Sequence, residues 1–80
     1  MSTVTGFVDP DLKSILIKGT TYGVDEEFEL EELPGLVFEL RNTEAFGLHL
    51  VCFDHKEDSD EMAFKYKQQC REVGKYRIGE

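Results

Sequence analysis

Apolar and polar residues alternate along much of this chain, with the period of two that is typical of β-strands. The alternation predicts strands at about residues 3–8, 12–18, 27–31, 36–41 and 46–53. Asp9-Pro10-Asp11 separates the first two, and the fixed φ of proline together with two side-chain acceptors favours a tight turn. We therefore expect the chain to open with a β-hairpin. The glycine-bounded stretch 19–23 fits either a strand extension or a connector.

The clearest predicted hairpin joins residues 36–41 to residues 46–53 through a three-residue loop at 43–45. This register puts one set of apolar residues on a single face, which we expect to be core, and pairs Leu40 with Leu48, Phe38 with Leu50, and Leu36 with Cys52. The opposite face places Val37 beside Val51 and Glu39 beside His49. Since both faces are partly apolar, the strand pair is expected to lie centrally in its sheet.

The segment from Glu27 to Glu31 alternates strictly between acid and apolar residue, which favours a strand with one wet face. The same residues are good helix formers, with Asp25 as a cap and Pro34-Gly35 as a stop, so a short helix remains the alternative.

Residues 59–73 are predicted to form a helix that packs on the sheet. Asp58 or Ser59 can cap it, the bases lie toward its carboxyl end, and Gly74 can terminate it. Its apolar stripe would be Met62, Ala63, Tyr66, Cys70 and Val73. Residues 75–78 fit a short edge strand or a frayed tail. The predicted fold is α+β: a single domain, residues 1–80, with an antiparallel sheet of four to five strands and one C-terminal helix packed on it.

Charge is abundant and uneven. The net charge is −8, with 15 acids and 4 bases in residues 1–61 (−11) and 5 bases and 2 acids in residues 62–80 (+3). An anionic body repels nucleic acid and anionic lipid, so neither direct nucleic-acid binding nor membrane binding is expected. The longest apolar run, residues 50–53, is far shorter than a membrane span, and the amino terminus lacks signal-peptide character. These features favour a cytoplasmic setting, in a bacterium or a virus-infected cell.

The sequence offers few residues that could form a catalytic or metal-binding site. His49, Cys52, Asp54 and His55 form the one cluster of metal-ligand type, but His49 and Cys52 point to opposite faces of a strand. Cys52 and Cys70 read as buried thiols, and no phosphate-binding loop is present. We expect no enzyme activity, no metal and no cofactor.

Two acidic clusters are the strongest candidate for a binding site. Glu27, Glu29 and Glu31 would project from one strand face about 6.7 Å apart, close to the spacing of phosphates along a nucleic acid. A solvated face that prevents edge-to-edge pairing explains the same pattern. The candidate protein-binding residues are Asp25, Glu26, Glu27, Glu29, Glu31, Glu32, Asp54, Glu57, Asp58, Asp60 and Glu61, with a secondary contact at Phe64, Lys67 and Arg71.

The sequence therefore predicts a small acidic binding protein, an inhibitor or regulator that docks on a cationic surface of a larger basic protein, such as a nucleic-acid-binding complex. Phage-encoded inhibitors, including anti-CRISPR proteins and DNA mimics, share this size and charge, although no motif supports the likeness. The alternative is a structural or assembly subunit that homo-oligomerises, with the acids serving solubility.

Overall fold

The computed structural model describes residues 3–54 and 64–79, and this part of the chain is all β. Eight strands are present there: β1 (Val4–Asp9), β2 (Ser14–Ile17), β3 (Thr20–Gly23), β4 (Glu27–Phe28), β5 (Leu36–Thr43), β6 (Gly47–Asp54), β7 (Phe64–Gln69) and β8 (Gly74–Ile78). The described residues contain no helix long and apolar enough to cross a membrane.

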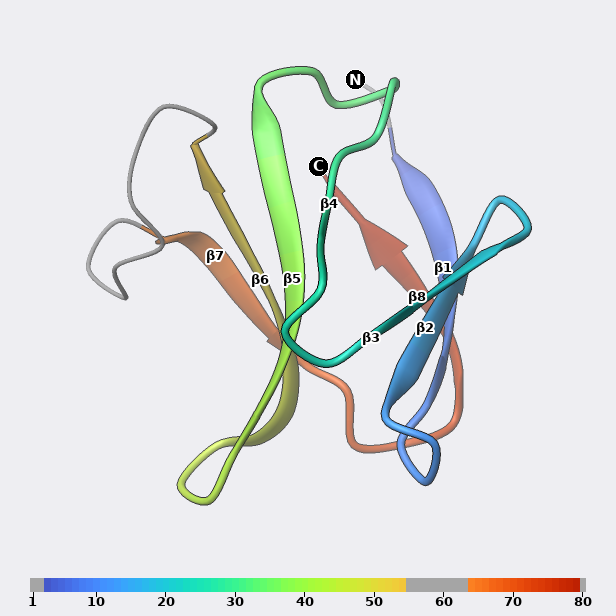
Figure 1. Ribbon diagram of the computed structural model, residues 1–80, viewed down its shortest axis with the longest axis vertical. Coiled ribbons are helices and arrows are strands. Elements are labelled where there is room, and N and C mark those ends of the chain that lie inside the picture. Colours follow the sequence, from blue (N-terminus) through green and yellow to red (C-terminus); the bar gives the residue numbers. More distant parts are fainter. Residues whose placement is uncertain (1–2, 55–63, 80) are drawn as a thin grey trace.

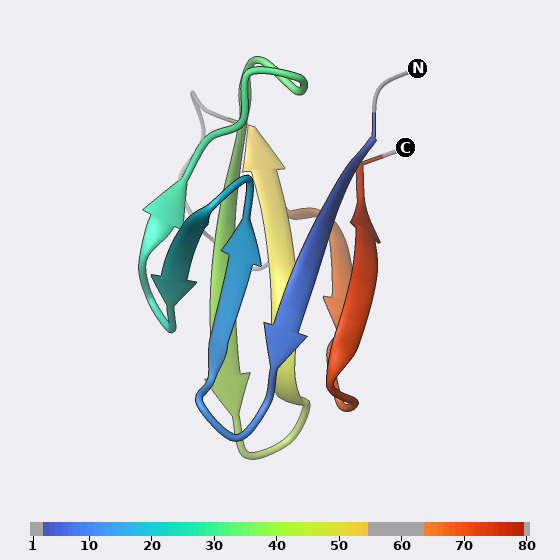
Figure 2. The same ribbon diagram turned by 90° about the vertical axis from the view of Figure 1, so that its right-hand side faces the viewer.

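The strands form two antiparallel sheets that face each other (Figure 1). Sheet A has the order β3-β2-β1-β8 and sheet B the order β4-β5-β6-β7. The chain passes from sheet A to sheet B after β3 and returns after β7, so the last strand, β8, pairs with the first (Figure 2). Two antiparallel sheets that pack face to face in this way form a β-sandwich.

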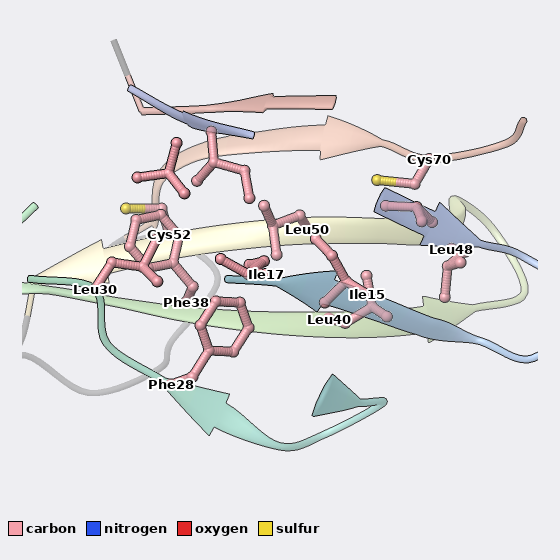
Figure 3. Close-up of a cluster of buried hydrophobic side chains, with 13 residues drawn as sticks. Ile15, Ile17, Phe28, Leu30, Phe38, Leu40, Leu48, Leu50, Cys52 and Cys70 are labelled. Carbon is pink, nitrogen blue, oxygen red and sulfur yellow. The ribbon is translucent and has the colours of Figure 1, made fainter. Parts of the chain in front are cut away.

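The core lies between the sheets and is filled by alternate residues of both (Figure 3). Ile15 and Ile17 of β2 face Leu40 and Leu50 of sheet B, and all four side chains are at most 1% exposed. Cys52 and Cys70 belong to the same cluster, as the sequence predicts. Burial of this one continuous cluster is the main stabilising contribution to a chain of this size.

Local turn chemistry forms sheet A. Asp9 Oδ1 accepts hydrogen bonds from the backbone N–H groups of Asp11 (3.0 Å) and Leu12 (3.3 Å), which closes the turn between β1 and β2. Lys18 and Gly19 both have positive φ, 51° and 84°, which is the backbone of a two-residue hairpin turn. Of the stretch 19–23, for which the sequence fits either a strand or a connector, Gly19 belongs to this turn and residues 20–23 form strand β3, paired with β2.

An aromatic stack closes the sandwich where the chain crosses between sheets. The Tyr22 and Phe28 rings stack with centroids 4.1 Å apart, and Phe28 stacks on Phe38 at 5.7 Å. These three residues come from β3, β4 and β5, so the stack joins the edge of sheet A to sheet B. Asp25 lies at the crossing with φ of 67°, and its N–H donates to the Leu40 carbonyl at 2.8 Å.

The α+β prediction is wrong. Residues 64–69 of the expected 59–73 helix form strand β7, which pairs antiparallel with β6, and residues 59–63 lie outside the described part. The expected apolar stripe fails too, since Cys70 is buried but Val73 is 63% exposed. Good capping residues did not decide the outcome, because β6 offers an unpaired edge whose hydrogen bonds favour extended backbone. Residues 75–78 do form an edge strand, within β8.

Two finer predictions also need correction. The strand expected at 27–31 is regular only at Glu27–Phe28, since a Leu33 N–H to Leu30 carbonyl bond of 3.1 Å turns the chain. The β5–β6 register is shifted by two residues: Phe38 pairs with Cys52, Leu40 with Leu50, Glu39 with Val51 and Arg41 with His49. A shift of two keeps every side chain on its expected face, so the predicted core face is correct.

Candidate functional site

The acidic edge, Glu27, Glu29 and Glu31, lies at the β4 side of sheet B. All three side chains are exposed, whereas Phe28 and Leu30 between them are 5% and 6% exposed. Burial of the apolar pair therefore fixes the backbone and turns the carboxylates to solvent. Because β4 is an edge strand, one side of this segment has no neighbouring strand in the described sheet.

The acids that flank this edge make local bonds. Glu26 Oε1 accepts the Gly23 N–H at 3.0 Å, which steadies the crossing between sheets. Glu32 Oε2 lies 2.6 Å from Lys18 Nζ. The hydrogen bond from Lys18 lowers the pKa of Glu32, and the same bond raises the pKa of Lys18. Through Lys18, Glu32 therefore links the segment after β4 to the turn between β2 and β3.

The second acidic cluster is only partly described. Asp54 ends β6 and is half-buried, opposite Leu36. The other four predicted members, Glu57, Asp58, Asp60 and Glu61, lie outside the described residues, as does His55.

Sheet B carries opposite charges at the two sides of its outer face. The register aligns Glu27 with Glu39, Glu39 with Val51, and Val51 with Lys67, in one row across β4, β5, β6 and β7. Paired residues of antiparallel strands project on the same side. With a strand spacing of about 4.8 Å, the row runs from acid to base over roughly 14 Å.

An ion pair occupies the middle of this face. Arg41 Nη2 and Nε lie 3.0 Å and 3.3 Å from Glu39 Oε1. The two residues are neighbours on the same side of β5, and Glu39 is only 7% exposed. A carboxylate so far removed from water needs a cation beside it, which Arg41 supplies.

Beyond the ion pair, toward β7, lies the cationic–aromatic cavity, a hollow of about 300 Å³ lined by Arg41, Thr43, Ala45, Phe46, His49, Phe64 and Lys67. The Arg41 guanidinium lies 4.9 Å from the Phe64 ring centre. Lys67 Nζ lies 5.3 Å from the ring centre of Phe46 and 5.8 Å from that of Phe64. Each cation is therefore within cation–π range of an aromatic ring.

His49 also lines this cavity and is 3% exposed. Its Nδ1 lies 2.8 Å from the Gly47 carbonyl oxygen, and because a carbonyl only accepts, Nδ1 carries the proton of this bond. The Phe46 ring meets the imidazole edge-on at 4.8 Å. His49 therefore contacts Gly47 and Phe46 rather than Glu39, its predicted cross-strand partner.

Within residues 3–54 and 64–79, no three His, Cys, Asp or Glu side chains converge as a metal site would require. Burial raises the pKa of both the Cys52 and Cys70 thiols to about 11, so each is a protonated core group at neutral pH.

The predicted secondary contact divides in two. Phe64 and Lys67 do lie together, in the cavity on β7, whereas Arg71 is exposed in the connection that follows β7 and does not line it. Sequence reasoning missed Arg41 and Phe46. The alternation of residues 36–41 does place Arg41 on the same face as Glu39. Because a helix was predicted for residues 59–73, the sequence did not indicate strand β7, which contributes Phe64 and Lys67 to the cavity.

Comparison with protein-family models, with curated proteins and with solved structures finds no match.

Proposed function

We propose that this chain is a non-enzymatic binding protein that docks through the acidic edge on a cationic surface of a larger protein. The observation that carries the proposal is the exposure of Glu27, Glu29 and Glu31 beside buried Phe28 and Leu30. Three carboxylates held on one short, anchored segment present a fixed array of acceptors to Lys and Arg side chains. A net charge of −8 adds long-range attraction to such a partner.

A groove that normally binds nucleic acid is the natural complement of this edge, because it is lined with Lys and Arg. The turn at Leu30–Leu33 limits the likeness to a phosphate backbone, since Glu31 lies within that turn and outside the β4–β5 ladder. The proposed contact is therefore short and charge-driven. Its association should weaken as salt rises, because exposed ion pairs are screened over a Debye length of about 8 Å at 0.15 M.

The test compares two variants of equal net charge. Replacing Glu27, Glu29 and Glu31 by Gln removes the edge, and replacing Asp11 by Asn with Glu44 and Glu72 by Gln removes three exposed acids elsewhere. Immobilised wild-type protein is used to capture partners from bacterial lysate at low salt. The proposal expects a protein that is retained by wild type and control and lost by the edge variant. Equal retention by both variants would show that only total charge matters and would refute an epitope at β4.

A second candidate function, self-assembly, rests on a different face. Phe7 and Leu16 pair across β1 and β2 on the outer face of sheet A and are 43% and 44% exposed. A two-fold contact would place this apolar pair against its copy. Sedimentation equilibrium of wild type and Leu16→Thr tests it. A dimer that the substitution dissociates supports assembly, and a monomer at 0.5 mM contradicts it.

A further inference from the structure

We propose that the cationic strip, Lys75 and Arg77 on the outer face of sheet A, is an interaction surface for a second copy of this chain and receives the acidic edge of that copy. The contact joins two different faces, so it is distinct from the two-fold contact of Phe7 and Leu16 with their copies. It rests on the proposed function in one respect, because it uses the same acidic edge as a binding element.

The residues of β1 that lie beside the cationic strip carry no charge. The register places Lys75 opposite Phe7. It places Arg77 opposite Thr5. Both basic side chains are exposed, and within residues 3–54 and 64–79 neither takes part in an ion pair. The strip can therefore receive carboxylates from another molecule, although the chain as a whole is strongly anionic.

The acidic edge lies on the opposite flank of the sandwich. Sheet A has the order β3-β2-β1-β8, so β8 is the strand farthest from β3. The short crossing at residues 24–26 joins β3 to β4, which keeps the acidic edge on the β3 flank (Figure 2). With neighbouring strands about 4.8 Å apart, three strand intervals, or roughly 14 Å, separate the two flanks of sheet A. The edge and the strip are thus too far apart to pair within one molecule, and a second copy can bring them together.

Salt decides whether two anionic molecules can make this contact. Each copy has a net charge of −8, which opposes association over long distances. At 0.15 M salt the Debye length is about 8 Å, whereas the Cα atoms extend over 31 × 28 × 19 Å. Charges far from the contact are therefore screened, and the facing carboxylates and cations determine whether the copies attract. Because exposed ion pairs are individually weak, we expect a dissociation constant on the order of 1 mM.

A contact between two different faces does not end at a dimer. Each added copy still presents one acidic edge and one cationic strip, so association continues along a row unless the arrangement closes into a ring. In such a row, each bound acidic edge is covered by the neighbouring copy. Self-association and the binding of a larger cationic partner therefore exclude each other at that edge.

Charge reversal on each face tests the contact. The reversed-strip variant replaces Lys75 and Arg77 by Glu, and the reversed-edge variant replaces Glu27 and Glu31 by Lys. In an NMR titration at 0.15 M salt, unlabelled reversed-edge protein, whose strip is native, is added to ¹⁵N-labelled reversed-strip protein, whose edge is native. The amides of residues 27–31 should shift in a saturable way, and unlabelled reversed-strip protein should leave them unshifted. Equal shifts in the two titrations would overturn the proposal.

An equally charged control separates the strip from net charge. Replacing Lys13 and Lys65 by Glu reverses two exposed bases outside β8 and gives the net charge of the reversed-strip variant. Dilution from about 2 mM to about 0.05 mM should shift the amides of residues 27–31 in the wild type and in this control, but not in the reversed-strip variant. Equal loss of the shifts in both variants would show that net repulsion alone acts and would overturn the proposal.

The wild-type dilution series decides the question even if a variant fails to fold, because amides that do not shift at residues 27–31 and 75–77 would exclude the contact. Capture of a larger partner separates this inference from the proposed function. The reversed-strip variant retains the acidic edge and should capture that partner as the wild type does, so either proposal can fail while the other stands.

Discussion

Glu27 and Glu39 lie directly opposite each other in the register of β4 and β5, so two carboxylates project from the same side of neighbouring strands. Like charges placed directly across a sheet destabilise it. Arg41 offsets part of this repulsion through its 3.0 Å contact with Glu39. Glu27 has the exposed position and Glu39 the buried one, so the arrangement retains an unfavourable acid at the edge of the sheet.

Glu27→Gln is therefore expected to stabilise the fold while it weakens binding. Removing the like charge should raise the free energy of unfolding by about 0.2 to 1 kcal/mol. Urea denaturation at low salt measures this gain, and the gain should shrink at high salt. Glu44→Gln, which removes an exposed acid from the loop between β5 and β6, is the control. If Glu27→Gln were destabilising, the carboxylate would have a structural role and the edge would not be available for a partner.

Arg41→Met tests the ion pair itself. Methionine keeps much of the apolar length but leaves the Glu39 carboxylate, 7% exposed, without its cation. We expect the free energy of unfolding to fall by about 1 to 3 kcal/mol, the cost of an unsatisfied buried polar group. The double variant Glu39→Gln, Arg41→Met should recover part of the loss, because the buried charge is then gone. Additive losses in thermal unfolding would show that the two side chains act separately.

The sequence predicts the buried faces well and the global fold poorly, for a physical reason. Alternation is local, so the inward positions Phe38, Leu40, Leu50 and Cys52 could be identified without knowing which strands are neighbours. The fate of residues 64–69 depends on the β6 edge, a partner more than ten residues away in sequence. Their helix-favouring caps are worth about 1 kcal/mol each, which pairing of a whole strand overrides.

The candidate site likewise has one part that local alternation predicts and one part that depends on which strands are neighbours. Exposure of Glu27, Glu29 and Glu31 is a local property and was predictable from alternation. The cavity requires β5, β6 and β7 to be adjacent, so it appears only once the topology is known.

Gly6 provides a test of the sandwich packing. A Cβ built at this position lies 3.0 Å from the Cδ1 atoms of both Ile15 and Ile78, closer than ordinary van der Waals contact. Gly6→Val adds still more volume between β1, β2 and β8 and should destabilise by about 1 to 3 kcal/mol through overpacking. Gly23→Ala is the control, since its nearest neighbour, Glu26 Oε1, is 4.0 Å away. Equal melting temperatures for Gly6→Val and wild type would mean that β1 does not face Ile15 and Ile78 as described.

The two core cysteines make stability depend on alkaline pH. Burial raises the pKa of the Cys52 and Cys70 thiols from 9.0 to about 11, so the folded chain holds these protons more tightly than the unfolded chain does. Their contribution to stability is therefore complete below pH 9 and is lost as the pH rises from 9 toward 11. The urea midpoint should therefore be lower at pH 10.5 than at pH 7.5.

Lysine and tyrosine titrate in the same alkaline range, so the cysteine contribution has to be separated by substitution. A Cys52→Ala, Cys70→Ala variant lacks both thiols, and its stability should fall less between pH 9 and 10.5 than that of the wild type. Neither native thiol should react quickly with a disulfide reagent at pH 8, because the reactive thiolate is scarce and both side chains are at most 1% exposed. Rapid labelling of Cys70 in the native protein would contradict its place in the core and the pairing of Cys70 N–H with the Leu48 carbonyl at 2.9 Å.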